Sequence, residues 1–554
     1  MMKLPTKGET FPTIINDNLL YVDKTELIHK IVTRPGCYFL SRPRRFGKSL
    51  LLSTIYELYC GNKDLFKSLW IASKAAEYKF EKFPVISISM TGDSCDKNEL
   101  NNSITTQLLE IAKDFGLKEI DGAKPADVVT KLIWSLNRES GKPVAFLIDE
   151  YDEPIRSHID NVAQAEINRD VLHTFYSSLK TAMDKNKIKL LFVTGVTKFA
   201  KASIFSVFNN LFDISMAPDY HNICGFTMDE FDRYFDSYLP AILEYNKEMK
   251  FLPASLKLSA FKNLVLKRYD GYSWDGKQRV INPYTLMNFF ERRELQNYWF
   301  SSGSPSFLLK YIKRRPLELT DTELFNLNIK QLDAIDVDKL QLSPLLFQTG
   351  YLTVAKRASV DTYLLKFPNK EVEDDFNYHL LSYLTRKVGN SQEILKLKEQ
   401  IANALMNFDA NQLADAFTRI LSWLTYFEQP EREGFHHAII FAVLKCLSFS
   451  VTSQVVSPEG VIDFLIKAPR NTNFVGEFKY EKLENEPEDD IETRRREKLK
   501  KAIALGEEQI AKRRYYKGLF AKGATVKCLA VGIVGRNDVA AKIFDPPEPW
   551  FPLP

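Results

Sequence analysis

A glycine, a lysine and a serine follow one another at Gly47, Lys48 and Ser49, at the end of the stretch RPRRFGKS. In a phosphate-binding loop the glycine lets the backbone approach the phosphates, the lysine reaches the β- and γ-phosphates and the hydroxyl ligates Mg²⁺. Arg42 stands where the usual G-x-x-x-x-G-K-[ST] pattern has its first glycine. These residues therefore predict a site for a nucleotide and Mg²⁺. The alternative is an ordinary helix N-terminus with a surface lysine.

Two acids, Asp149 and Glu150, directly follow the apolar run VAFLI. A carboxylate at the end of a buried strand can hold Mg²⁺, and a second acid can polarise the water that attacks the γ-phosphate. Asp152 competes with Glu150 for that second role. Another apolar run, KLLFVT, ends in Thr194, a polar residue that could sense the γ-phosphate. Together with the lysine and serine, these side chains predict an ATP site.

A second group of chemical residues lies near the C-terminus, where Glu477 and Lys479 stand two apart in an apolar run. The period of a strand puts both on one face. Asp463 lies in an earlier β-like run, GVIDFLI, and two adjacent strands would bring it beside Glu477. Paired carboxylates bind Mg²⁺, and the lysine could orient or deprotonate a metal-bound water for attack on a phosphodiester. An E-x-K triplet alone is common on exposed strands, so the pairing with Asp463 is what predicts a nuclease site.

The first group must be positioned by strands and helices that alternate up to about residue 225. The expected strands are residues 36–40, 85–90, 144–148 and 189–194, and a helix over residues 49–59 follows the first. Such alternation predicts a mostly parallel sheet covered on both faces. The strand at 85–90 separates the loop from the acidic pair in sequence. That order is similar to the branch of P-loop ATPases that has an inserted strand and a catalytic glutamate.

The pattern changes at residues 225–230, GFTMDE, which contain a T-x-x-E capping box. A mainly helical stretch follows, then short β-like pieces, another helical stretch, and a final α/β region. The expected domains are an ATPase core at 1–224, a helical lid at 225–345, a mixed or helical connecting region at 346–425 and a nuclease-like α/β domain at 426–554.

Composition sets broad limits on function. The 554 residues carry a net charge of +4, so the chain is no polycation and any nucleic-acid site must be a local patch. The six cysteines form no CxxC pair, which gives no indication of a zinc site or a disulfide framework. The N-terminus lacks an apolar signal region, and no apolar run approaches the ~20 residues of a membrane span. A cytoplasmic protein without membrane contact is expected.

Four motifs in order resemble the bacterial AAA-ATPase-like family, over roughly residues 5–225 and the GFT that opens the lid. They are YVDKT (21–25), RPRRFGKS (42–49), LIDEYDEPI (147–155) and TGVTKFAKASIFS (194–206). The resemblance implies an α/β core with ATP and Mg²⁺ bound between core and lid. It also implies that Arg44, Arg45 and Phe46 belong to the nucleotide loop, since an arginine-rich loop is usual there. Arg44, Arg45 and Arg156 are all candidates for an arginine finger.

Residues 425–540 resemble the PD-(D/E)XK nuclease superfamily, in the version often fused to the AAA-like family. The resemblance implies a restriction-endonuclease-like α/β domain with Asp463, Glu477 and Lys479 as its metal-binding and catalytic core. By position, Glu433 is the accessory metal-binding acid and Gln509 a residue near the site. Val461 stands where an arginine is usual. His436 and His437 have a simpler interpretation as capping or packing residues.

Two functions remain open from the sequence. The first is an ATP-dependent, Mg²⁺-dependent nuclease that acts on DNA or RNA, with DNA preferred and defence against mobile elements as one interpretation of its role. The second is a nucleotide-dependent switch that forms homo-oligomers and uses a non-catalytic C-terminal domain to bind nucleic acid or protein.

Overall fold

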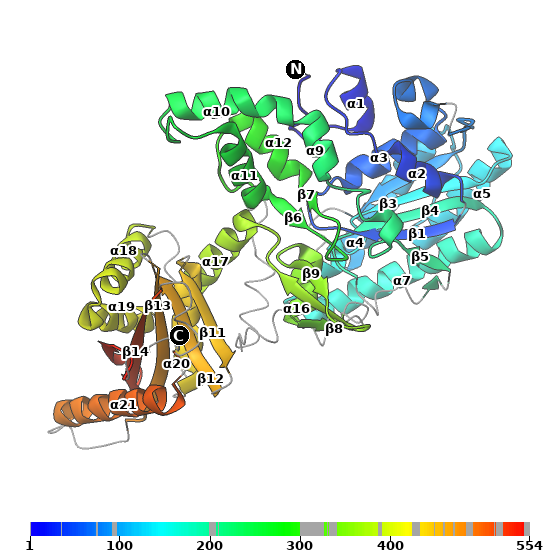
Figure 1. Ribbon diagram of the computed structural model, residues 1–554. Coiled ribbons are helices and arrows are strands. Elements are labelled where there is room, and N and C mark those ends of the chain that lie inside the picture. The colour runs from blue at the N-terminus through cyan, green and yellow to red at the C-terminus, as the bar shows by residue number, and fades with distance from the viewer. Residues whose placement is uncertain are drawn as a thin grey trace. The chain divides into compact units, whose positions relative to one another are not determined.

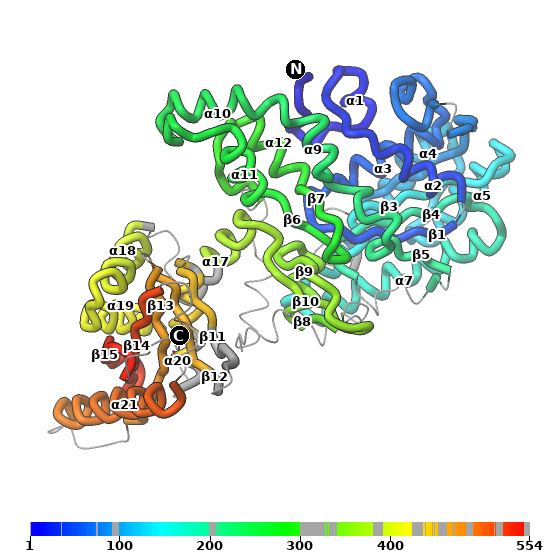
Figure 2. The backbone as a smooth tube through the Cα atoms, in the orientation of Figure 1, coloured from blue at the N-terminus to red at the C-terminus, as the bar shows by residue number. Residues whose placement is uncertain are grey.

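The computed structural model of the chain (Figures 1 and 2) describes most residues, which are grouped in two compact units. The units are Met1–Leu317 with Thr322–Glu373, and Glu318–Asp321 with Asp374–Pro554. The described residues are 2–34, 36–73, 76–90, 97–198, 207–208, 210–299, 326–328, 331, 341–385, 391–423, 433–447, 449–457, 460–468, 471–483, 491–514, 516 and 524–547.

The first unit contains a five-stranded parallel sheet in the order β2–β3–β4–β1–β5. Its strands are β1 (Gly36–Ser41), β2 (Val85–Ser89), β3 (Val144–Asp149), β4 (Ile188–Gly195) and β5 (Leu211–Asp213). Because both faces of β3 and β4 are buried, these strands appear in the sequence as continuous apolar runs. The predicted α/β core with a parallel sheet is confirmed.

The inserted strand is β4, which lies between the loop strand β1 and the acidic strand β3. The strand that separates the two motifs in sequence, β2, lies at the edge of the sheet, beyond β3. The core therefore has the predicted inserted strand. That strand is β4, whereas the order of the motifs in the sequence had pointed to β2. The carboxyl ends of β1, β3 and β4 lie side by side, which brings the loop, the acidic pair and Thr194 to one edge.

Helices cover the sheet on both sides (Figure 1). Helices α4, α5 and α7 share one hydrophobic core with β1 to β4, and α3 packs against β2 and β3. The bounds are α1 (Phe11–Asn16), α2 (Thr25–Val32), α3 (Lys48–Tyr59), η1 (Lys63–Phe66), η2 (Trp70–Ala72), α4 (Lys97–Asp114), α5 (Pro125–Ser140), α6 (Glu153–Arg156), α7 (Val162–Asp184) and η3 (Pro218–Tyr220).

A helical lid follows, with its own core of aromatic and aliphatic side chains. It consists of α9 (Met228–Tyr234), η4 (Asp236–Tyr238), α10 (Leu239–Glu248), α11 (Leu258–Tyr269), α12 (Pro283–Arg292) and the two-stranded sheet of β6 (Asp270–Tyr272) and β7 (Val280–Ile281). The predicted capping box is present, with Thr227 as the N-cap of α9. Leu20 and Val22 of the N-terminal segment pack into the lid core, so this segment joins lid and sheet.

The unit also includes α16 (Leu342–Thr349) and an antiparallel sheet in the order β8–β10–β9. Its strands are β8 (Asn326–Asn328), β9 (Thr353–Arg357) and β10 (Thr362–Lys366). Helix α17 (Lys370–Thr385) spans the division between the two units.

The second unit is a mixed sheet in the order β11–β12–β13–β14–β15, in which only β13 and β14 are parallel. Helices α18, α19 and α20 share a core with one face, and α21 packs on the other through Ile510. The bounds are α18 (Ser391–Asn407), α19 (Ala410–Ser422), α20 (Glu433–Cys446), β11 (Ser450–Ser457), β12 (Gly460–Ala468), β13 (Thr472–Glu481), α21 (Ile491–Arg513), β14 (Thr525–Val534) and β15 (Asp538–Phe544).

The compact units divide the chain near residue 373 rather than at the expected boundaries of 345 and 425. Residues 346–425, expected as a connecting region, are shared: the β9–β10 hairpin belongs to the first unit and α18 and α19 to the second. The apolar side chains of α18 and α19 bury themselves against the C-terminal sheet. In the described part of the chain, no helix is long and apolar enough to cross a membrane.

Candidate nucleotide and metal sites

The loop between β1 and α3 turns into the helix through left-handed backbone. Gly47, the N-cap of α3, has φ of +90°, and Arg45 has φ of +64°. A glycine adopts this conformation without steric cost, which explains the glycine before Lys48. The first N–H groups of α3 have no acceptor within the helix, and with the helix dipole they form a site for an anion.

The loop serine, the acidic strand end and the neighbouring strand end meet as predicted. Ser49 Oγ donates a hydrogen bond to Asp149 Oδ2 at 2.6 Å. Thr194 Oγ1 donates to Asp149 Oδ1 at 2.5 Å, so this hydroxyl holds the carboxylate in place. The hydroxyl and carboxylate oxygens of Ser49 and Asp149 are the hard ligands that suit Mg²⁺. The donor set therefore fits the expected ion.

Lys48 and Glu150 face a common cavity of about 350 Å³, which Ser49 also lines. The buried Lys48 Nζ donates to the carbonyl oxygens of Arg42 and Pro43, at 3.0 and 3.1 Å. Burial lowers the pKa of Lys48, and the nearby acids Asp149 and Glu150 oppose that shift. Glu150 itself has φ of +51°, a strained value for a non-glycine residue that often accompanies functional sites.

The cavity lies between core and lid. Its other walls come from the N-terminal segment, the turn before α9 and the start of α12. Apolar side chains such as Val22, Ile28, Phe226 and Met287 line this part. A cavity that is cationic at the loop and apolar beyond it suits a ligand with phosphates at one end and a base at the other.

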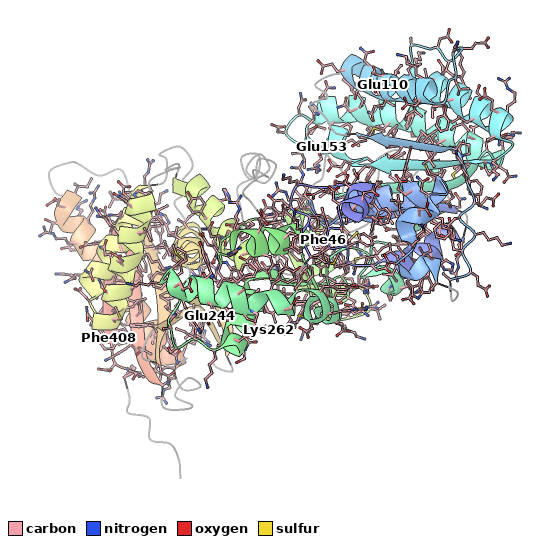
Figure 3. All side chains as sticks on the ribbon, turned by 90° about the horizontal axis from the view of Figure 1, so that it is seen from above. Phe46, Glu110, Glu153, Glu244, Lys262 and Phe408 are labelled. Atoms are coloured by element: carbon pink, nitrogen blue, oxygen red, sulfur yellow. The ribbon has the colours of Figure 1, made fainter. Side chains whose placement is uncertain are left out.

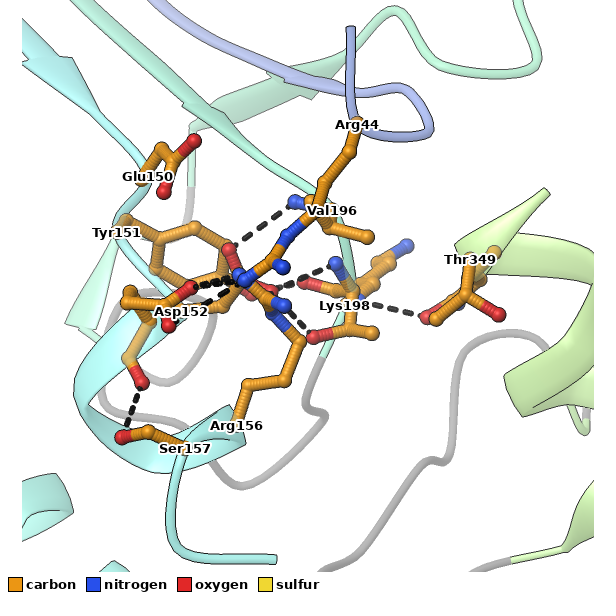
Figure 4. A network of polar contacts seen from close by, with 12 residues as sticks. Arg44, Glu150, Tyr151, Asp152, Arg156, Ser157, Val196, Lys198 and Thr349 are labelled. Atoms are coloured by element: carbon orange, nitrogen blue, oxygen red, sulfur yellow. Dashed lines mark hydrogen bonds and ion pairs between the residues drawn. The ribbon is translucent and has the colours of Figure 1, made fainter. Parts of the chain in front are cut away.

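Asp152 does not face this cavity. Its fully buried carboxylate accepts hydrogen bonds from the backbone of Val196 (3.0 Å) and from the backbone and hydroxyl of Thr197 (2.8 and 2.5 Å). It also accepts one from Arg156 Nε at 3.2 Å (Figure 4). These contacts fix the segment after β4 beneath the acidic pair. Asp152 therefore holds Arg156 and the chain after β4 in place, and Glu150 is the one of the two candidate acids that lines the cavity.

The three arginines that were candidates for an arginine finger have different surroundings. Arg156 is buried and paired with Asp152 and Glu153. Arg45 lies with its guanidinium 3.9 Å from the ring centre of Tyr284 on the lid. Arg44 is 45% exposed and pairs with Glu153 at 3.2 Å (Figure 4).

Phe46 also packs against the lid. This side chain, which is labelled in Figure 3, is fully buried and packs edge-on against Tyr272 and Trp274, with ring centres 4.8 and 5.6 Å away. Two of the predicted loop residues, Arg45 and Phe46, therefore connect the phosphate loop to the lid.

The contacts of Arg42 show why this loop has an arginine where the usual pattern has its first glycine. Its buried guanidinium donates to the carbonyl oxygens of Ser41 (2.9 Å), Ser215 (2.8 Å) and Tyr220 (3.2 Å). It also lies 3.9 Å from the ring centre of Trp274. The side chain thus anchors the loop to the segment after β5 and to the lid. The sequence shows the departure from glycine but not this role, because the partners are far away in the chain.

In the second unit, β12 and β13 pair antiparallel, and the last pair of their register, Phe464 opposite Gly476, directly adjoins Asp463 on one strand and Glu477 on the other. Asp463 Oδ2 accepts a hydrogen bond from the backbone N–H of Phe478 at 3.0 Å. Lys479 Nζ lies 3.5 Å from Glu477 Oε2 and donates to the Phe478 carbonyl at 2.9 Å. The predicted acid, acid and lysine are therefore brought together.

Glu477 is the most perturbed group of this site. It is fully buried, and the cation beside it is Lys479, whose Nζ lies 3.5 Å from Glu477 Oε2. Burial, followed by the close Asp463 carboxyl, raises the pKa of Glu477 to about 8, and Lys479 acts in the opposite direction. Two neighbouring carboxyl groups are costly to bury in their charged forms unless cations compensate them, and Lys479 supplies one positive charge for both. The pair with Asp463 therefore fits a divalent ion, although no group of three His, Cys, Asp or Glu side chains converges within the described residues.

The structure describes the remaining predicted residues of this site only in part. Glu433 is the first residue of α20, and its side chain lies outside the part of the chain that the structure describes. Gln509 is half-buried on α21, one turn after Gly506, where this helix approaches the backbone oxygen of Glu477. His436 stacks on Tyr480 and His437 packs on Phe478, with ring centres 5.0 Å apart in each pair. Both histidine rings thus take part in packing.

Comparison with known proteins agrees with both predicted families. The family described as predicted AAA-ATPase matches residues 6–205, and the PD-(D/E)XK nuclease superfamily matches residues 431–542. A protein of Azotobacter chroococcum mcd 1, named as the uncharacterized protein in the vnfD 5′ region, is 30% identical over 477 residues, or 84% of this chain and 87% of that protein. The chain belongs to the AAA-ATPase-like family. It carries a PD-(D/E)XK nuclease superfamily domain at its C-terminal end, so the predicted fusion is confirmed.

The crystal structure of Cdc6p from Pyrobaculum aerophilum shares 13% identity with this AAA-ATPase-like protein. It covers 63% of this chain and 90% of that chain, with a TM-score of 0.26. A likeness this slight says nothing further about the fold.

Restoring the standard glycine at position 42 is expected to damage the AAA-ATPase-like protein. Arg42→Gly removes the guanidinium donor from the Ser215 carbonyl, removes one of the donors to the Tyr220 carbonyl, and removes the contact with Trp274. The free energy of unfolding should fall by about 2–5 kcal/mol, measured by urea denaturation. Arg44→Gly, at an exposed position of the same loop, is the control and should change it by less than about 1 kcal/mol. Equal stability of Arg42→Gly and wild type would contradict the anchoring role.

Removing the charge of Glu477 should stabilise the metal-free protein while weakening metal binding. Because the pKa of Glu477 is raised, the folded state disfavours its charged form, and this penalty grows as the pH rises from about 5 to 8. In EDTA the melting temperature of the second unit should therefore be higher in Glu477→Gln than in wild type, by a few degrees near pH 8. The difference should shrink towards pH 5. A variant that melts below wild type at pH 8 would disprove this.

Proposed function

We propose that the protein binds and hydrolyses ATP with Mg²⁺ in its first unit and cleaves DNA with Mg²⁺ in its second, with the nucleotide controlling cleavage. The observation that carries the nuclease function is Glu477. It is fully buried, burial and the nearby Asp463 carboxyl raise its pKa, and Lys479 lies 3.5 Å away. Two acids that share one lysine suit a divalent ion, whereas the buried Asp152 carboxylate accepts hydrogen bonds from Val196, Thr197 and Arg156.

For ATP, the residues have separate roles. Lys48 and the first N–H groups of α3 hold the β- and γ-phosphates. Ser49 and Asp149, which Thr194 keeps in place, hold Mg²⁺. When bound, the ion neutralises charge that develops on the phosphates. Glu150 lines the cavity beside Lys48 and accepts the proton of the attacking water.

For DNA, Asp463 and Glu477 hold Mg²⁺, with Glu433 as a further ligand. When bound, the ion makes the phosphodiester more electrophilic. Lys479 stabilises negative charge and orients the attacking water from its place beside Glu477. Gln509, one turn after Gly506 on α21, helps to position the substrate. Exposed basic residues of α21, such as Arg496 and Lys500, can contact backbone phosphates.

Cleavage assays on the full chain test this function. Plasmid and single-stranded DNA, with an RNA control, are incubated with Mg²⁺ or Mn²⁺, with and without ATP. The wild type should cleave DNA, EDTA should stop it, and Asp463→Asn should be inactive although its amide oxygen can still accept from Phe478. No cleavage under any condition, or equal cleavage by Asp463→Asn, would reject the nuclease. DNA binding without cleavage would instead support a switch with a non-catalytic binding domain.

A further inference from the structure

A buried ion pair joins the N-terminal segment to the first helix of the lid. Lys24 Nζ lies 2.5 Å from Glu230 Oε1 and 2.7 Å from Oε2, so it donates to both oxygens. The two side chains are only 11% and 19% exposed. Burial lowers the pKa of Lys24, and Glu230 opposes this shift. Such a pair depends on both partners, because losing one leaves the other as an unpaired buried charge.

Both partners are held by local structure. Glu230 belongs to the capping box of α9, in which its carboxylate accepts from the Thr227 N–H at 2.8 Å and its own N–H donates to the Thr227 hydroxyl at 3.2 Å. Lys24 is the N-cap of α2, whose first turn Asp23 fixes by accepting from Thr25 N at 2.8 Å. Asp23 also accepts from Trp70 N at 2.7 Å. The pair therefore connects two rigid helix starts.

The pair also borders the nucleotide cavity. Lys24 lines it directly, and so do Gly225 and Phe226, which lead into α9. On the other side of the cavity, Tyr284 of the lid lies under Arg45. The lid thus contacts the phosphate loop through Tyr284 and the N-terminal segment through Glu230. Lys24 belongs to the motif YVDKT and Glu230 to GFTMDE, and the ATP site described above gives neither charged residue a role.

We propose that Lys24 is a positioning residue for ATP: its ion pair with Glu230 holds α9 and the turn before it over the cavity. Affinity for ATP then depends on a contact outside the phosphate loop. The inference rests on the proposed ATP binding. The alternative is that the Glu230 carboxylate only caps α9 and has no part in ATP binding.

The experiment measures ATP affinity of the full chain by calorimetry with Mg²⁺. Glu230→Gln keeps an oxygen for the capping box, since glutamine also serves there, but removes the charge. Lys24→Met removes the other charge. Each should weaken ATP binding at least about fivefold, a typical size for coupling between sites. The double variant should be no weaker than either single one, because all three lose the same interaction. Thr227→Ala breaks the cap but leaves the pair, and should stay within about twofold of wild type.

Affinities of Lys24→Met and Glu230→Gln within about twofold of wild type would overturn the inference, as would an equal loss in Thr227→Ala. If Lys24→Met fails to fold, the double variant, which leaves no unpaired charge, provides the comparison. A wild type that does not bind ATP would overturn both the proposed function and this inference. Wild-type binding with unaffected variants would overturn the inference alone.

Discussion

Replacing Glu150 with glutamine is expected to lower kcat for ATP hydrolysis at least about 100-fold while ATP affinity stays within about threefold. Glu150 lines the cavity with Lys48 and Ser49, and its left-handed backbone directs it there. Glutamine fills the same space but cannot accept the proton of the attacking water. Steady-state phosphate release gives kcat, and calorimetry gives the affinity.

Asp152→Asn is the matched control. The Asp152 carboxylate binds Arg156 and the backbone after β4, so an amide at this position leaves a buried arginine without its full counter-charge. We expect a lower melting temperature for this variant. If Asp152→Asn instead hydrolyses ATP slowly at an unchanged melting temperature, and Glu150→Gln retains the wild-type rate, Asp152 is the base and the assignment of Glu150 is wrong.

Replacing Lys479 with methionine is expected to lower the rate of DNA cleavage at least about 100-fold, the usual effect of losing a group that stabilises transition-state charge. The affinity for Mn²⁺ should not fall, because removing a cation 3.5 Å from Glu477 cannot weaken attraction for another cation. Initial rates on plasmid DNA and calorimetry with Mn²⁺ check the two effects.

The control for charge alone is Lys467→Met, on the neighbouring strand β12, where the side chain is exposed. It should retain most of the cleavage rate. A Lys479→Met variant that cleaves as fast as Lys467→Met would show that the lysine is not part of the catalytic machinery.

Much of the core could be predicted from the sequence because burial on both faces makes β3 and β4 continuous apolar runs. Which strand lies between β1 and β3 could not be predicted, because the position of β4 depends on how the crossover helices pack. In the second unit, too, the sequence predicted helices but not where they pack. The apolar periodicity of α18 and α19 predicts helices, yet it does not tell which sheet they cover, so their membership of the C-terminal unit was not predicted.

The contacts at the candidate sites also fall into those that the sequence predicted and those that it did not. Adjacent strands predicted that Asp463 and Glu477 come together, and β12 and β13 pair up to the residues directly beside them, Phe464 and Gly476. The roles of Arg42 and Lys24 were not predicted. Their partners, Ser215 and Glu230, are distant in sequence, and a single charged side chain gives no indication of a distant carbonyl or carboxylate.

The central claim, that Lys48 and its loop bind ATP, is tested most directly by thermal denaturation of wild type and Lys48→Ala at increasing ATP–Mg²⁺. A ligand that binds the folded state stabilises it by about 2.7 kcal/mol at 100 times its Kd, so the melting temperature of the wild type should rise steadily with concentration. Lys48→Ala should show no rise relative to its own ligand-free value. An equal rise in the variant, or none in the wild type, would contradict the claim.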